Sequence, residues 1–258
     1  MGNLLLQTVM ERFDEFEGIA APLGFAHEIV DFALPFFLDG AEAQKRLSFY
    51  EKALKNRNGR RFSMHGVFMD IQPQSQDPYI REASRKRISE NLTFAGRLGI
   101  DRIVFHSGYN PLIKNRFYDD SWLEGSAEYW KLALQEFGGT ILIENMFDDR
   151  PDMLLRLMED VACERLRICL DVGHCQCFSR MPLEKWFELA PYIDYFHLND
   201  NRGQSDEHLS VGAGSIDWTT FNGLARSLGS PDALLELSDA GKVESALQFM
   251  EKNRIYPL

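Results

Sequence analysis

The sequence predicts a single α/β domain in which eight strands alternate with helices, the pattern of a (β/α)8 TIM barrel. Short apolar runs alternate with longer amphipathic ones along residues 1–258. Several short runs, such as RIVFH, TILIEN and RICLD, are apolar almost throughout, which is typical of parallel strands buried on both faces. An open doubly wound sheet is less favoured, because the glycine-rich turn that usually follows its first strand is missing.

The expected elements follow from these patterns. Strands are expected at 4–9, 27–32, 61–65, 102–106, 141–144, 167–171, 192–198 and 233–237. Helices are expected at 15–23, 41–55, 77–98, 122–137, 151–164, 183–189, 218–228 and 242–252. The helix at 77–98 has the clearest boundaries, since Asp77 and Pro78 open it and Gly99 follows it.

Composition and charge exclude several protein classes. Apolar residues make up 45% of the chain and charged residues 26%, which indicates a globular protein. The 28 basic and 39 acidic residues give a net charge of −11, which disfavours a generic nucleic-acid binder. The four cysteines do not form a disulfide framework, and we find neither a signal peptide nor a membrane-spanning run. We therefore expect a cytoplasmic protein.

Histidines and carboxylates gather where the strands are expected to end. In a TIM barrel these carboxyl ends form the active face. The strand ends and the loop after the seventh strand carry His65, His106, Glu144, Asp171, His174, His197, Asp206, His208 and Glu236. Clustered carboxylates repel one another and are costly to bury, and divalent cations relieve both problems. Mixed imidazole and carboxylate ligands suit zinc, manganese or ferrous iron rather than calcium or magnesium. Nine ligands exceed the needs of one ion, so we expect two or three ions, with zinc preferred.

Two motifs resemble those of a known superfamily. LDVGH at 170–174 and HLNDNRGQSDEHLSVGAGSID at 197–217 are similar to motifs of xylose isomerase-like TIM barrels, which include sugar phosphate isomerases and epimerases and the endonuclease IV enzymes of AP endonuclease family 2. LDVGH stands where endonuclease IV has L-D-T-C-H. The resemblance covers about residues 65–236 and implies three ions: one on His65, His106 and Glu144, one on Glu144, Asp171, His197 and Glu236, and one on His174, Asp206 and His208.

Two enzymatic functions follow from this resemblance. The leading hypothesis is a hydrolase that cleaves a phosphoester in abasic-site DNA or in a smaller phosphorylated substrate, because all nine residues then have a role. The alternative is a sugar or sugar-phosphate isomerase or epimerase that uses one ion and the catalytic pair Glu144 and Glu236 for proton exchange. A metal-dependent binding protein without catalysis is the third possibility.

Other loop residues are candidates for contact with the substrate. We expect Phe68, Tyr109 and Trp218, with Phe147 and Phe178, either to form an apolar wall for the substrate or to pack against helices, the second role especially for Trp218. Arg202 is expected to bind an anionic group. The basic residues of the active face are few, namely Lys114, Arg116, Arg150, Arg180 and Arg202, which favours a small substrate over a long duplex.

Three further groups of residues have expected supporting roles. His27 and Glu28 either support a metal ligand or belong to the core. Cys175 and Cys177 are expected to be structural. Gly212 and Gly214 are expected to permit a close backbone approach.

Overall fold

The computed structural model describes residues 2–56, 59–179 and 181–258. Arg180, expected in a loop of the active face, lies outside the described residues. In the part of the chain that is described, eight parallel strands close into a barrel in sequence order, with β1 hydrogen-bonded to β8. The strands are β1 (Leu4–Thr8), β2 (Ala26–Ile29), β3 (Ser63–His65), β4 (Arg102–His106), β5 (Thr140–Glu144), β6 (Leu166–Asp171), β7 (Ile193–Leu198) and β8 (Asp232–Leu235). The predicted fold class is confirmed.

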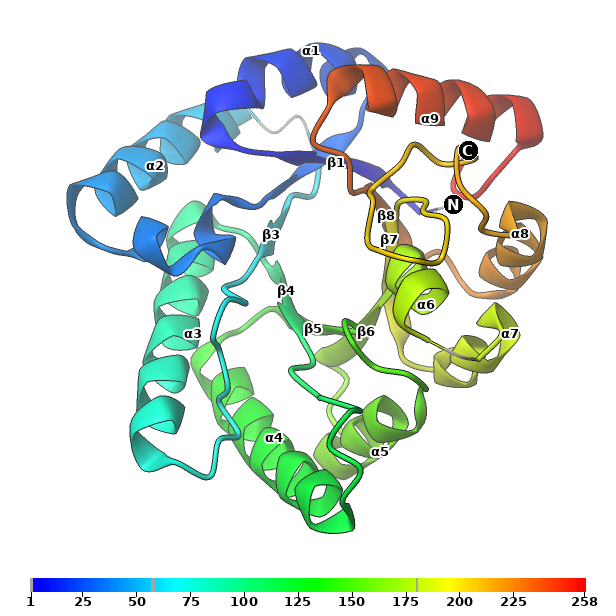
Figure 1. Cartoon of the computed structure of the whole chain (residues 1–258). Coiled ribbons are helices and arrows are strands. Elements are labelled where there is room, and N and C mark those ends of the chain that lie inside the picture. The colour runs from blue at the N-terminus through cyan, green and yellow to red at the C-terminus, as the bar shows by residue number, and fades with distance from the viewer. Residues whose placement is uncertain (1, 57–58, 180) are drawn as a thin grey trace.

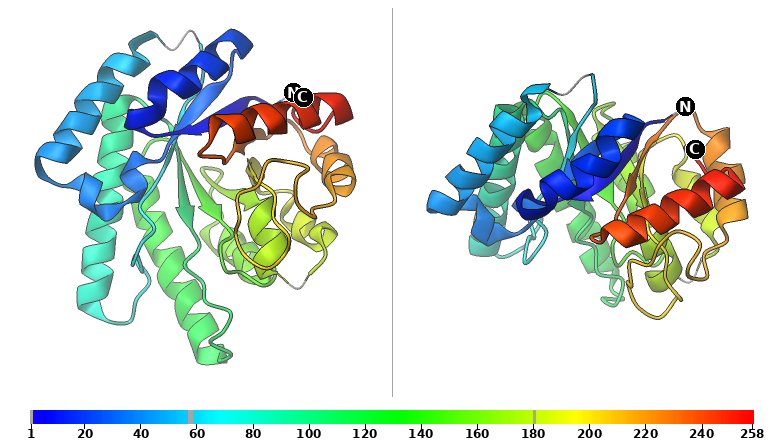
Figure 2. Two further views of the ribbon diagram at one scale, coloured as in Figure 1. Left: turned by 45° about the horizontal axis from the view of Figure 1, so that its top comes forward. Right: turned by 90° about the horizontal axis from the view of Figure 1, so that it is seen from above.

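Helices surround the barrel, as the view along its axis shows (Figure 1). They are α1 (Phe13–Leu23), α2 (Gly40–Ala53), α3 (Pro78–Leu98), α4 (Arg116–Glu136), α5 (Asp152–Val161), α6 (Val172–Phe178), α7 (Leu183–Trp186), α8 (Trp218–Ser227) and α9 (Ala240–Asn253). Figure 2 shows the two termini near each other beside α9. None of the described helices is long and apolar enough to span a membrane.

Local capping and turns account for three of the differences from the predicted elements. Helix α4 begins six residues earlier than predicted, because the side chain of Asn115 accepts a hydrogen bond from the backbone N–H of Phe117 at 2.9 Å. Strand β2 ends early in a 3₁₀ turn at Asp31–Ala33. Helix α6 was not predicted, since its seven residues are too short to show a helical repeat.

The strand register brings polar residues side by side at the carboxyl end of the barrel. His106 lies beside Glu144 on β4 and β5, and Asp171 lies beside His197 on β6 and β7. Each pair occupies the last or nearly the last position of its strands. The ends of these four strands therefore bring imidazoles and carboxylates together, as the sequence predicted.

A column of polar side chains continues through the barrel interior below this face. At the opposite end, the guanidinium Nη1 of Arg102 lies 2.8 Å from the carboxylate of Asp232 and its Cζ lies 4.5 Å from the ring centre of Tyr195. The Tyr195 hydroxyl lies 3.1 Å from Ser63 Oγ, which donates to Glu28 at 2.8 Å. Since buried polar groups are costly unless they are paired, this column fixes the side chain of Glu28 beneath the site.

Candidate metal centre

The structure brings all nine predicted ligands together at one end of the barrel, in three groups. The first metal group is His65, His106 and Glu144, the second is Glu144, Asp171, His197 and Glu236, and the third is His174, Asp206 and His208. Within each group, one ligand atom from every residue lies within 4.8 Å of the others. Strand ends supply the first two groups, whereas α6 and the β7–α8 loop supply the third.

Glu144 lies at the centre of the arrangement and belongs to two groups. Its Oε2 lies 3.3 Å from His65 Nε2 and 3.4 Å from His106 Nε2. Its Oε1 lies 3.2 Å from His197 Nδ1. The carboxylate is fully buried, and Oε2 has no hydrogen-bond partner among the described residues. A buried carboxylate oxygen directed at two imidazoles fits a bridging metal ligand, because a cation would satisfy it.

Backbone carbonyls orient three of the histidines. In each, ring Nδ1 lies 2.8 Å from a carbonyl oxygen, for His65 that of Gly66, for His174 that of Asn145 and for His208 that of Glu236. A carbonyl oxygen only accepts, so Nδ1 carries the proton and Nε2 is left as the ligand atom. For His174 and His208, Nε2 lies 3.4 and 2.9 Å from Asp206 Oδ2.

His197 is held the other way round, by Glu28. Its Nδ1 faces Glu144 and Glu236, whereas its Nε2 lies 3.3 Å from Glu28 Oε1. Glu28 is fully buried, and its second oxygen accepts from Ser63. A metal ion on Nδ1 would leave the ring proton on Nε2, the nitrogen that faces the Glu28 carboxylate. Of the two roles considered for Glu28, support of a metal ligand fits the structure.

His27 belongs to the core, which is the second of the two roles considered for His27 and Glu28. It points away from the metal groups, its Nε2 lies 2.8 Å from Glu17 Oε2, and its ring lies between those of Phe13 and Phe62. Successive side chains of a strand point to opposite faces, so neighbouring Glu28 and His27 have different surroundings. His27 is the one histidine of six outside the metal groups.

Two asparagines that the sequence analysis missed position Asp171. Asn145 donates to the backbone oxygen of Asp171 at 3.0 Å and accepts from its N–H at 2.9 Å. Asn199 donates to Asp171 Oδ2 at 3.1 Å and to Glu236 Oε2 at 3.4 Å. Gly173 is needed nearby, because a Cβ there would lie 1.9 Å from Asn199 Oδ1. The positions of both asparagines directly after strand-end residues were the available signal.

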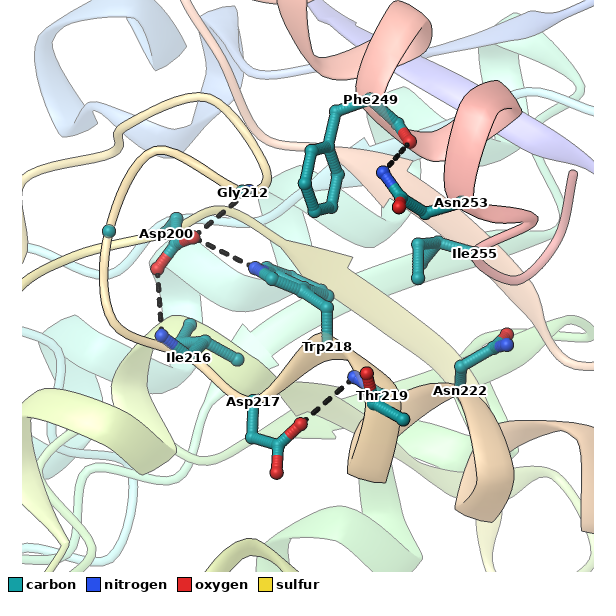
Figure 3. Close-up of a pocket in the computed structure, with 11 residues that line it drawn as sticks. Asp200, Gly212, Ile216, Asp217, Trp218, Thr219, Asn222, Phe249, Asn253 and Ile255 are labelled. Atoms are coloured by element: carbon teal, nitrogen blue, oxygen red, sulfur yellow. Dashed lines mark hydrogen bonds between the residues drawn. The ribbon is translucent and has the colours of Figure 1, made fainter.

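The β7–α8 loop, which carries Asp206 and His208, is anchored by the buried carboxylate of Asp200. This carboxylate accepts from the backbone of Gly212 at 3.0 Å and of Ile216 at 3.2 Å, and from the indole N–H of Trp218 at 2.8 Å (Figure 3). A Cβ at Gly214 would lie 2.2 Å from Asp200 Oδ1, so the backbone approaches this carboxylate as closely as expected. Gly212 has φ +86°, a conformation that favours glycine.

Trp218, considered as a substrate contact or as a packing residue, packs beneath the β7–α8 loop. The side chain is buried, with 5% exposure, and it lines a cavity of about 350 Å³ between this loop, α8 and α9 that contains none of the nine ligands (Figure 3). The physical reason is that its N–H is committed to Asp200. Trp218 therefore stabilises the loop that supplies the third metal group.

His208 has a strained backbone, with φ +45°. A left-handed conformation is unfavourable for a residue with a Cβ and occurs mostly where the surroundings enforce it. Here the ring bonds to the Glu236 carbonyl, and Lys242 Nζ donates to the His208 carbonyl at 2.7 Å. Both contacts direct the imidazole toward Asp206.

Several candidate ligands hold protons that a bound cation would displace. Burial opposes charge on His174, yet Asp171 and Asp206 raise its pKa to about 10. Burial likewise opposes charge on His208, yet the bond to Asp206 raises its pKa to about 10. Burial raises the pKa of Asp171, and the carboxylate of Glu236 adds to this. A metal ion needs neutral imidazoles and ionised carboxylates, so its binding releases protons.

His106 already has the protonation state that a ligand needs. Burial lowers its pKa to about 3, and the neighbouring histidines His65 and His174 add to this effect. Its ring packs on Phe68, with ring centres 4.8 Å apart. The imidazole is therefore neutral at pH 7, with Nε2 toward Glu144.

The remaining predicted contact residues lie at different distances from the centre. Phe68 packs against His65 and His106 and lines the cavity beside them. Tyr109 lines the same cavity but is largely buried and donates its hydroxyl to Asp119 at 2.7 Å. Arg202 is paired with Glu207 at 2.6 Å, so its guanidinium is already engaged.

Cys175 and Cys177, expected to be structural, lie in and at the end of α6. Neither cysteine belongs to a metal group among the described residues. Cys175 is buried, and its Sγ lies 3.4 Å from the side-chain nitrogen of Asn145.

Together, the fold and the site define a class: a TIM barrel with a candidate centre for several divalent ions at the carboxyl ends of its strands. The chain belongs to the xylose isomerase-like TIM barrel family, whose model matches residues 30–253. The family resemblance seen in the motifs is thereby confirmed.

Two curated relatives show the range of the sequence similarity. An uncharacterized protein of Methanocaldococcus jannaschii, MJ1311, is 27% identical over 180 residues, which are 66% of this chain and 61% of that protein. A probable endonuclease 4 of Mycobacterium leprae is 22% identical over 204 residues, 73% of this chain and 77% of that protein. The match thus spans about three fifths of MJ1311.

Three solved structures share the fold over nearly the whole chain. The TTHB071 protein from Thermus thermophilus, soaked with ZnCl2, has a TM-score of 0.78 at 27% identity, covering 97% of both chains. A D-tagatose 3-epimerase-like protein has 0.76 at 22% identity, covering 97% of this chain and 96% of that one. Endonuclease IV from Thermus thermophilus has 0.68 at 17% identity, covering 97% and 99%. The neighbours thus include a nuclease and an epimerase-like protein.

Proposed function

We propose that this protein is a hydrolase that cleaves a phosphoester with the help of divalent ions, preferentially zinc, held by the three metal groups. The observation that carries the proposal is the third metal group. His174, Asp206 and His208 form a complete ligand set in addition to the four residues that a single ion requires. A one-ion enzyme has no use for this set, whereas a hydrolase that must neutralise a phosphoryl group does.

The donor set of the three groups fits several divalent ions. Backbone carbonyls fix which ring nitrogen of His65, His174 and His208 faces its group, and His197 turns its Nδ1 toward Glu144. Glu144 connects the first two groups through its two oxygens. Bound divalent ions supply Lewis acidity, which activates water and offsets the charge of a phosphoester.

The chain's own residues contribute orientation and exclusion of water. Glu144 and Asp171 are fully buried, and Asn145 and Asn199 fix Asp171 through three hydrogen bonds. Glu236 is more exposed at the rim, with its carbonyl bonded to His208. The deeper carboxylates are thus held in place, while Glu236 and Asp206 are the two carboxylates of the metal groups that are partly exposed toward a substrate.

The proposed substrate is a small phosphorylated compound rather than a long duplex. The described cations of the active-face loops are few, and three of them are engaged by acids: Arg116 by Asp120, Arg150 by Asp149 and Asp152, and Arg202 by Glu207. A duplex needs several phosphate contacts, and these residues leave few for that purpose.

Metal counting tests the proposal. Purified protein is expected to carry two to three zinc ions per chain, and His208→Ala to lose one ion together with most of its phosphoesterase activity. His27→Gln is the matched control, because His27 lies outside the metal groups, and its ion count should not change. Fully metallated protein that releases no product from any phosphomonoester, phosphodiester or abasic-site oligonucleotide would refute the proposal.

A sugar or sugar-phosphate isomerase or epimerase is the second candidate. It is favoured by the second metal group, which is complete in itself and contains both Glu144 and Glu236, the predicted acid/base pair. The likeness to the D-tagatose 3-epimerase-like structure concerns the fold. One manganese ion per chain, unchanged in His208→Ala, together with epimerisation of a ketose, would establish this function instead.

A further inference from the structure

A cavity of about 670 Å³ opens beside the first metal group. Of the nine ligands only His106 lines it, and Phe68, which packs on His106, forms the adjoining wall. The other walls come from the segments that follow β3, β4 and β5, from the end of α6, and from Phe105 of β4, Ile88 of α3 and Trp130 of α4. The volume is within the range of small-molecule sites and is continuous with the metal centre.

The walls of this cavity are largely apolar and partly aromatic. Phe147 and Phe178 pack edge to face with ring centres 5.0 Å apart, and Phe178 reaches His174 at 5.7 Å. Phe68 and the Phe147–Phe178 pair thus flank the ligands from two sides. Leu112 and Phe147 are 84% and 53% exposed at the rim. Large apolar side chains that are exposed together around a cavity mark a surface that binds another molecule.

The charges of the lining indicate which part of a substrate enters. Asp70 and Asp149 line the cavity, and Lys114 is the one Lys or Arg among its described lining residues. Two carboxylates against one ammonium do not favour a second anionic group such as a further phosphate. The anionic part of a substrate is attracted to the metal groups, and the cavity is left for an uncharged part.

From these observations we infer that the substrate is a small phosphoester whose organic group is aromatic or apolar, and that this group occupies the cavity between Phe68, Leu112 and Phe147. The inference rests on the proposed function, since it places the phosphoryl group at the metal centre. It adds the chemical class of the organic part and the residues that select it.

Binding of two phosphonates to the zinc-loaded protein tests this inference. Phenylphosphonate and methylphosphonate carry the same anionic group and differ in the ring. Burial of a phenyl ring in place of a methyl group is expected to favour phenylphosphonate by about tenfold or more in calorimetric Kd. Phe147→Ala should reduce that preference by about two- to tenfold, because it removes one aromatic contact.

The design includes a matched control and separates the two proposals. Phe117 is also an exposed aromatic residue, 72% exposed, but it does not line the cavity, so Phe117→Ala should retain the full preference. Equal affinity for the two phosphonates, no binding of either, or equal effects of both variants would overturn the inference. Hydrolysis is measured separately: a phenyl preference that depends on Phe147 without phosphoester cleavage supports the cavity assignment and refutes only the proposed reaction.

Discussion

Replacement of Glu28 by glutamine is expected to weaken metal binding at the second group, although Glu28 is not a predicted ligand. Glu28 Oε1 lies 3.3 Å from His197 Nε2, and its other oxygen accepts from Ser63. Glutamine has nearly the same shape, and its amide oxygen can still accept from Nε2–H. The loss is therefore that of the negative charge, which makes the imidazole a better donor of its Nδ1 lone pair.

The magnitude follows from the position of Glu28. The carboxylate and the ring are both fully buried, so water does not screen their interaction. Loss of a carboxylate that supports a metal-bound histidine typically lowers affinity 10- to 100-fold, which corresponds to about 1.4–2.7 kcal/mol. Glu28→Ala should lower affinity further, because it empties the space beside His197 Nε2 and leaves Ser63 Oγ without its acceptor.

The assay is a competitive zinc titration against a chromophoric chelator, with elemental analysis of the bound ions. Glu17→Gln is the matched control, because Glu17 holds His27 at 2.8 Å in a similar pair outside the centre, and its zinc affinity should equal that of the wild type. Affinity of Glu28→Gln within twofold of the wild type, or an equal loss in Glu17→Gln, would refute the reasoning.

Four further outcomes are expected. Trp218→Phe should lower the free energy of unfolding by about 1–3 kcal/mol, because Asp200 loses a buried hydrogen bond, without changing KM; a raised KM at unchanged stability would contradict the structural role. Burial raises the pKa of Asp148 to about 6, above its ordinary value of 3.8. The folded protein therefore binds this proton more tightly than the unfolded chain does, and the resulting stabilisation is complete below about pH 4 and is lost as pH rises through about 6. In urea unfolding of chelated protein, Asp148→Asn should match the wild type at pH 4 and exceed it by about 1–3 kcal/mol at pH 7.5; the reverse pH order would refute this. Gly173→Ala should displace Asn199 and reduce the zinc content, and unchanged zinc content would contradict that clash. Chelation should lower Tm by about 10 °C or more and added zinc should restore it; an unchanged Tm would show that these groups bind no ion tightly.

Much of the barrel could be predicted from the sequence because its strands are buried on both faces. Apolar runs such as 102–106 have no surface side, so the pattern itself marks them, and their polar last residues mark the carboxyl end. The gathering of the candidate ligands at one face could be predicted for the same reason, since His106, Glu144 and Asp171 are polar residues at the ends of apolar runs. Closure of the barrel then brings residues far apart in sequence together.

The missed features depend on contacts that no local pattern contains. Trp218 opens a helix after a loop, as a substrate-facing residue can, and only the fold shows that its N–H meets Asp200. Glu28 and His27 are neighbours in a polar dipeptide, and their different roles depend on which faces the barrel interior. Helix α6 is set by one cap, in which the backbone N–H of His174 donates to Asp171 at 2.6 Å.

The anchoring of the β7–α8 loop on Asp200 has an evolutionary consequence. The strand ends that supply the first two metal groups are part of the closed sheet and cannot change without rebuilding the barrel. Asp206 and His208, in contrast, belong to a loop that is held by hydrogen bonds from the backbone of Gly212 and Ile216 to the Asp200 carboxylate. Insertions or deletions between residues 200 and 212 would change the third metal group, while the rest of the barrel keeps its structure. Changes in this single loop would therefore alter the third candidate ligand set while the first two groups keep their positions in the barrel.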